Sequence, residues 1–131
     1  MNNIVIINFT FDGSVWNPDS KNLRKNLIDA AGGKKPPLGV AAHHIVGKDT
    51  PTAAAKMKAF GIDVDDANNG VFLPTSKKCN MYGPIHNGRH GQEYRNTVEL
   101  VFQNVENRED CLDALEAIKQ NLLAGYIPLY D

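Results

Sequence analysis

All four histidines of the 131-residue chain lie in one segment, between His43 and His90. His86 and His90 are four residues apart, so at the start of a helix both imidazoles would project from one face and could bind a single metal ion. Neutral imidazole is a common ligand of zinc, nickel and other first-row divalent ions. A catalytic site of this kind usually takes three protein ligands and leaves one position for water or substrate, so a third histidine is needed.

His43 and His44 are adjacent, in a stretch that favours extended backbone. Because side chains alternate along a strand, the two rings should point to opposite sides and cannot easily bind the same ion. One of them can complete the metal site, and the other, with an ordinary pKa of about 6.5, can act as a general base near neutral pH. The spacing thus predicts three metal ligands and one base.

Four short motifs follow one another along the segment that contains the histidines. They are Ala42-His43-His44-Ile45-Val46, Gly61-Ile62-Asp63, Ala67-Asn68-Asn69-Gly70-Val71-Phe72-Leu73-Pro74 and His86-Asn87-Gly88-Arg89-His90. In this order, and over roughly residues 23–102, they resemble the AHH family of the HNH/endonuclease VII superfamily, and several motifs together are more specific than any one. The resemblance implies an α+β fold built on a ββα-metal (HNH) finger, in which two strands and a helix hold one divalent ion.

The resemblance also implies a role for each motif residue. Three imidazoles would bind the metal ion: His43, His86 and His90. His44 would be the base that activates water, and Asn69 would hold the loop between the strands so that the base is correctly oriented. Asn68 is the neighbouring alternative for the motif asparagine. The ion would be zinc, nickel, magnesium or manganese.

Periodicity and capping residues predict the elements that position these groups. They are a strand at residues 4–11, a helix at 21–31, a strand at 41–46, a helix from Pro51 with Thr50 as its N-cap, a second strand at 71–73 and helices at 88–105 and 107–124. We therefore expect a single domain, residues 1–131, with its motif core at 41–104. The helix after Pro51 would be inserted between the finger strands. The N-terminal strand and helix (4–31) and the C-terminal helix (107–124) would pack against the core.

Composition is compatible with this fold and places positive charge around the histidines. A hydrophobic content of 42% suffices for one modest core, and two cysteines without a CxxC pair make a disulfide framework unexpected. The net charge is −1, but residues 21–95 hold twelve basic and six acidic residues, whereas residues 96–131 hold two and seven. Such segregation favours a basic face for nucleic acid. The candidates for phosphate contacts are Lys34, Lys35, Lys77, Lys78, Arg89 and Arg95.

Other uses of the same residue types fit the sequence less well. A metalloprotease of the zincin type needs glutamate directly after the first histidine of the pair, and position 87 is asparagine. A zinc deaminase needs a His-x-Glu motif and a Pro-Cys-x-x-Cys motif, and neither occurs. The aspartates at 63–66 fail the spacing of a calcium-binding EF-hand loop.

The sequence thus predicts a metal-dependent endonuclease that hydrolyses phosphodiester bonds of DNA with little sequence specificity. The family resemblance further suggests the toxin domain of a bacterial antagonism system, neutralised by a cognate immunity protein. The alternatives are a ribonuclease toxin that uses the same site and a non-catalytic, zinc-stabilised module that only binds nucleic acid. No signal peptide or membrane partner is expected, and the site of action would be the cytoplasm of a target bacterium after secretion.

Overall fold

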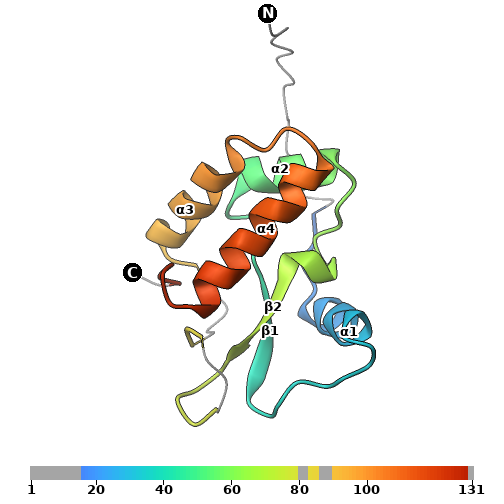
Figure 1. Cartoon of the computed structure of the whole chain (residues 1–131), viewed down its shortest axis with the longest axis vertical. Coiled ribbons are helices and arrows are strands. Elements are labelled where there is room, and N and C mark those ends of the chain that lie inside the picture. The colour runs from blue at the N-terminus through green and yellow to red at the C-terminus, as the bar shows by residue number, and fades with distance from the viewer. Residues whose placement is uncertain (1–15, 80–82, 86–89, 130–131) are drawn as a thin grey trace, which may run out of the picture.

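The computed structural model describes residues 16–79, 83–85 and 90–129, and Figure 1 shows how its elements are arranged. In chain order they are α1 (Ser20–Ala30), β1 (Val40–His44), α2 (Pro51–Ala59), the 3-10 turn η1 (Ala67–Asn69), β2 (Gly70–Pro74), α3 (Gln92–Phe102) and α4 (Arg108–Leu123). The predicted α+β class is confirmed, with two strands, an inserted helix and flanking helices on either side in sequence. The strand predicted at residues 4–11 lies outside the described residues.

The two strands form an antiparallel pair that carries the adjacent histidines at one end. His44 is opposite Gly70, and Val40 is opposite Pro74 at the other end. Helix α1 packs against one side of this pair, while α2, α3 and α4 gather around its histidine end (Figure 1). A Cβ added at Gly70 would lie 2.6 Å from Leu23 Cδ1, so glycine at this position lets α1 approach the start of β2 closely.

Helices α1 and α4 begin at residues of the types that favour N-cap positions. The Asp19 carboxylate accepts hydrogen bonds from the first amides of α1, and the Asn107 side chain accepts one from the Asp110 amide of α4. Thr50 is the N-cap residue of α2, but its hydroxyl donates to the Gly47 carbonyl and makes no cap bond. Thr50 and Pro51 thus take the predicted N-cap and first helical positions, but the side-chain cap bond is missing because the preceding turn uses the hydroxyl.

Helices α2 and α3 bind each other's ends through two charged side chains. The Glu99 carboxylate of α3 accepts hydrogen bonds from the Thr52 and Ala53 amides, at 3.1 and 3.0 Å, and so caps the start of α2. The Lys56 ammonium of α2 donates to the carbonyls of Phe102 and Gln103, at 2.7 and 3.1 Å, where α3 ends. Each charge has the sign that the helix dipole favours at that end. The two helices are thereby tied together independently of their apolar contacts.

The helix predicted at residues 88–105 is shorter than expected, since α3 begins only at Gln92. Gly91 has extended backbone, with φ −74° and ψ 166°, and its amide donates to the Leu129 carbonyl instead of entering the helix. His90 therefore precedes the helix. The predicted arrangement of His86 and His90 on one helical face was wrong for His90, and His86 itself lies outside the described residues.

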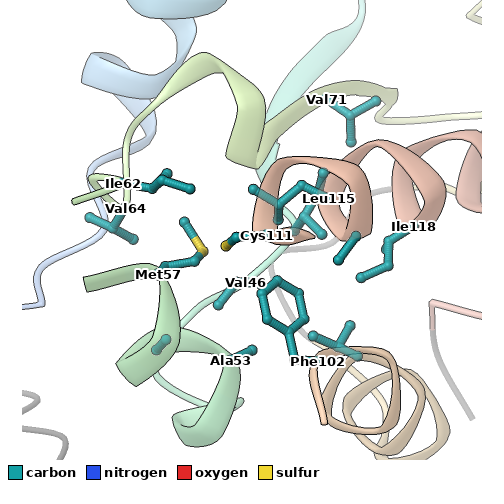
Figure 2. Packing of buried hydrophobic residues seen from close by; sticks show 14 of the residues in the cluster. Val46, Ala53, Met57, Ile62, Val64, Val71, Phe102, Cys111, Leu115 and Ile118 are labelled. Atoms are coloured by element: carbon teal, nitrogen blue, oxygen red, sulfur yellow. The ribbon is translucent and has the colours of Figure 1, made fainter. Parts of the chain in front are cut away.

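The hydrophobic core lies between the strands and helices α2, α3 and α4 (Figure 2). Side chains of all these elements and of their connections meet there, including Val46, Met57, Val71, Phe102, Leu115 and Ile118. Leu115 and Ile118 lie on α4, and their burial at helical spacing fits the amphipathic helix predicted there. Among the described residues no helix combines the length and the apolar character needed to span a membrane.

Candidate active site

Strand β1 directs its two histidines to different surroundings. His43 is 2% exposed and contacts residues of the α3 region, whereas His44 is bonded to the loop that precedes η1. The register with β2 places them opposite Val71 and Gly70. This is the separation that alternation along a strand predicts.

On one side of β1, the rings of His43 and His90 lie together although 47 positions separate them in the sequence. Their centroids are 4.9 Å apart and the ring planes meet at 69°. Tyr94 of α3 lies beside both rings, with centroid distances of 5.9 Å to His43 and 4.4 Å to His90. Its hydroxyl donates to the Ile45 carbonyl at 2.7 Å, which fixes the tyrosine between β1 and α3. Burial raises the pKa of Tyr94 far above its ordinary value, so the hydroxyl stays neutral.

The orientation of His90 is set by a carboxylate from the turn before α2. Its Nδ1 lies 2.7 Å from Asp49 Oδ2. Partial burial alone would raise the pKa of the Asp49 carboxyl, but the hydrogen bond from His90 and the charge of that ring outweigh burial, and the pKa lies below its usual value. With Nδ1 engaged by Asp49, Nε2 is the nitrogen of His90 that can bind a metal ion, an arrangement common among metal-binding histidines.

On the other side of β1, His44 pairs with Asp65. Its Nε2 lies 2.7 Å from Asp65 Oδ1, and the two side chains are only 14% and 9% exposed. The same carboxylate oxygen accepts a hydrogen bond from the Asp19 amide at 2.9 Å. The second ring nitrogen of His44, Nδ1, is therefore the one that can accept a proton.

Asn69, the last residue of η1, holds the segment that follows the histidine strand. Its Oδ1 accepts from the Val46 amide at 2.9 Å, and its Nδ2 donates to the carbonyls of Val46 and Val64 at 2.9 and 2.8 Å. The residue is fully buried. Asn68, the alternative, is exposed and bonds only within its own turn, to Asp66. Of the two asparagines, Asn69 has the contacts expected of the loop-holding residue.

A family model described as a nuclease family of the HNH/ENDO VII superfamily with conserved AHH matches residues 24–123. The chain belongs to this AHH nuclease family. The tripeptide of its description occurs once in the sequence, at Ala42-His43-His44 on β1. No curated protein and no solved structure matches the chain.

Membership of the AHH family implies a nucleic-acid substrate, and nucleases of this superfamily generally use a divalent metal ion. The residues present fit such an ion. Two imidazoles bound at about 2.0–2.1 Å to one tetrahedral ion have ring centroids roughly 5 Å apart, and those of His43 and His90 are 4.9 Å apart. Within the described residues no group of three metal-ligating side chains forms, and the predicted third ligand, His86, lies outside them.

The remaining predicted site residues of this AHH chain fall in two places. Arg95 lies next to His90 and donates to its carbonyl at 3.1 Å, while its other donors reach Gln92. The four predicted lysines are exposed and lie in the loops at the opposite end of the strand pair: Lys34, Lys35, Lys77 and Lys78. Arg89 lies outside the described residues.

Sequence reasoning missed three residues of the candidate site: Asp49, Asp65 and Tyr94. The two aspartates are 41 and 21 positions from the histidines they bond, so no local spacing marks them. Asp65 was considered only as part of a calcium loop, and Tyr94 only as part of the apolar stripe of its helix. For Asp65 the signal that could have found it is chemical, because a buried carboxylate needs a partner and imidazole is the partner that this segment supplies. Asp49 is exposed and gives no such signal.

We expect Asn69→Ala to lower the free energy of unfolding by about 2–4 kcal/mol, because three buried backbone groups lose their partner at once. Asn69→Asp should be worse, since it would point a carboxylate at two carbonyl oxygens. Asn68→Ala is the matched control and should change the stability by less than about 0.5 kcal/mol. Urea denaturation of the three variants measures these differences. Equal effects at positions 68 and 69 would contradict the assignment of the loop-holding role to Asn69.

Proposed function

We propose that this chain is a metal-dependent endonuclease that hydrolyses phosphodiester bonds of DNA with little sequence specificity. The observation that carries the proposal is the convergence of His43 and His90 to a centroid distance of 4.9 Å, while the neighbouring His44, on the other side of the strand, is bonded through Nε2 to Asp65. Two imidazoles suited to one ion and an adjacent residue whose imidazole can accept a proton are the kinds of groups that hydrolysis of a phosphodiester requires.

The metal ligands in this proposal are His43, His90 and His86. A divalent ion bound by them supplies Lewis-acid stabilisation of the negative charge that develops on the phosphate and on the departing oxygen. The protein keeps the two described ligands in place from opposite directions, because β1 positions His43 and Asp49 orients the ring of His90. Tyr94 lies beside both rings, and its hydroxyl oxygen is 3.4 Å from Nε2 of His43.

His44 is the proposed general base. It would take a proton from the attacking water at Nδ1, while Nε2 keeps its hydrogen bond to Asp65. A positioned base of this type contributes a factor of about 10² to 10⁴ in rate. Asn69 supports it indirectly, because its bonds to Val46 hold the end of β1 against β2 at the level of His44.

The proposed phosphate-binding surface is the far end of the strand pair. The loops before β1 and after β2 are joined there, since the Thr75 amide and hydroxyl both donate to the Gly39 carbonyl at 2.9 Å. The four exposed lysines of these loops form what we call the lysine end: Lys34, Lys35, Lys77 and Lys78. Figure 1 shows both loops below the helices, away from the histidines. Contacts to phosphates alone carry no sequence information, which agrees with low specificity.

We further propose that the domain acts as a toxin in the cytoplasm of a target bacterium and that an immunity protein neutralises it. This part of the proposal is supported by the resemblance to polymorphic toxins and not by a contact in the molecule. An immunity protein that covered the histidines or the lysine end would block the substrate at either place.

The experiment that tests the function is incubation of the purified chain with supercoiled plasmid and with structured RNA. Each substrate is offered with EDTA and with magnesium, manganese, nickel or zinc. We expect nicking and linearisation of plasmid that depends on the ion and stops with EDTA. Cleavage of RNA alone would favour the ribonuclease alternative. Binding of either nucleic acid without cleavage under any ion would overturn the proposal in favour of the zinc-stabilised binding module.

Two histidine variants separate the base from the ligands. We expect His44→Ala to lower kcat for plasmid cleavage by about 10²- to 10⁴-fold with unchanged affinity for the ion, because only the proton acceptor is lost. His90→Ala should lose both ion affinity and cleavage. Calorimetric titration with nickel measures the affinity for the ion, and gel assays measure plasmid cleavage. Plasmid cleavage by His44→Ala at the wild-type rate would remove it as the base.

The lysine end has its own test. We expect the double variant Lys77→Ala/Lys78→Ala to raise KM with little change in kcat and to reduce the slope of log affinity against log salt by up to about 2, as phosphate contacts are lost. Lys58→Ala/Lys119→Ala is the control, because it removes the same two positive charges from α2 and α4, away from this surface. Equal shifts in the variant and the control would show that overall charge, and not this surface, governs binding.

A further inference from the structure

The structure contains a carboxylate–imidazole pair on the side of β1 that faces away from His90. Asp65 Oδ1 lies 2.7 Å from His44 Nε2, and both side chains are almost fully covered. Such a hydrogen bond to a carboxylate is short and strong compared with one to a neutral acceptor. The pair is thus more than a solvent-exposed contact between two side chains.

Asp65 is itself held in place by α1. Its Oδ1 accepts a hydrogen bond from the Asp19 amide at 2.9 Å, and its backbone carbonyl accepts one from Asn26 Nδ2 at 2.8 Å. Its own amide donates to Asp63 Oδ2 at 3.3 Å. Three contacts therefore fix the aspartate, two of them from a helix that carries no proposed catalytic residue, and the direction of the carboxylate does not depend on His44.

We infer that Asp65 is a positioning residue: it holds His44 as the tautomer protonated on Nε2 and so makes Nδ1 the proton-accepting atom. The inference rests on the proposed function, in which His44 is the base. Rotating the imidazole by half a turn about its Cβ–Cγ bond would remove Nε2 from Oδ1, so ring orientation and tautomer are fixed together.

The carboxylate also suits the charge that the reaction produces. When a water proton moves to Nδ1, the bond from oxygen to that proton breaks, a bond from nitrogen to it forms, and the ring becomes a cation. Its Nε2–H remains on nitrogen, and Asp65 gains no proton but faces the new positive charge with its negative one. A carboxylate in this position stabilises an imidazolium as it does in other carboxylate–histidine pairs.

The kinetic test compares two substitutions at Asp65. We expect Asp65→Ala to lower kcat for plasmid cleavage by about 10- to 100-fold with KM unchanged, the usual effect of losing a residue that orients another. Asp65→Asn should recover only the part of this loss that is due to orientation, because it keeps an acceptor for Nε2–H but lacks the negative charge that faces the imidazolium. Because Oδ1 accepts hydrogen bonds from both His44 and the Asp19 amide, the side chain of an asparagine should be oriented with its oxygen, and not its nitrogen, at this position. Thermal unfolding of both variants, recorded alongside, ensures that kcat is compared on folded protein.

Asp29→Asn is the matched control, since it removes one negative charge from an exposed side chain of α1. It should cleave at the wild-type rate. The inference is overturned if Asp65→Ala keeps the wild-type kcat, or if Asp29→Asn loses as much activity as Asp65→Ala.

A second measurement does not depend on activity. Nitrogen-15 correlation spectra of the wild-type imidazoles at pH about 9, where an ordinary ring is neutral, report which nitrogen carries the proton. His44→Gln identifies the His44 signals by their absence. We expect the Nε2–H form at His44, and an Nδ1–H form would overturn the inference. A wild-type chain that shows the Nε2–H form but cleaves no nucleic acid would refute the proposed function while supporting the positioning role.

Discussion

The candidate site depends on one buried amide. Asn69 bonds the backbone of Val46 through both its oxygen and its nitrogen and reaches Val64 with the second hydrogen of the same nitrogen. These bonds join three separate segments: the end of β1, the loop before η1 and the start of β2. A two-stranded sheet is marginal by itself, so its end would fray without them. The direction of His43 and His44 follows from this connection.

Different residues hold the histidines on the two sides of β1. His43 faces α3, where Tyr94 contacts both its ring and the ring of His90, and where Asp49 completes the arrangement. His44 faces the side supported by α1, through Asp65. The strand thus separates a region suited to a cation from a region suited to accepting a proton. Each region has its own aspartate, so a change in one carboxylate need not disturb the other histidine directly.

Local patterns in the sequence predicted most of the elements, whereas the roles of the site residues stay predictions. The apolar repeat of α4, the caps at Asp19 and Asn107 and the glycine that ends α2 are encoded within a few residues, and the structure has these features. The start of α3 was missed, because a backbone bond from Gly91 to Leu129 is a tertiary contact that periodicity does not record. Asp49 and Asp65 were missed for the same reason. Their partners are brought to them by the fold.

The reciprocal capping of α2 and α3 has a further consequence for the site. Asp49 lies two residues before α2 and His90 two residues before α3, so each member of this pair is attached to the beginning of a helix. Because Glu99 and Lys56 fasten the two helices to one another, the pair is carried on a single rigid unit and not on two independently moving turns. The imidazole is therefore preorganised before any cation arrives, and the entropy lost when the ion is captured is correspondingly small.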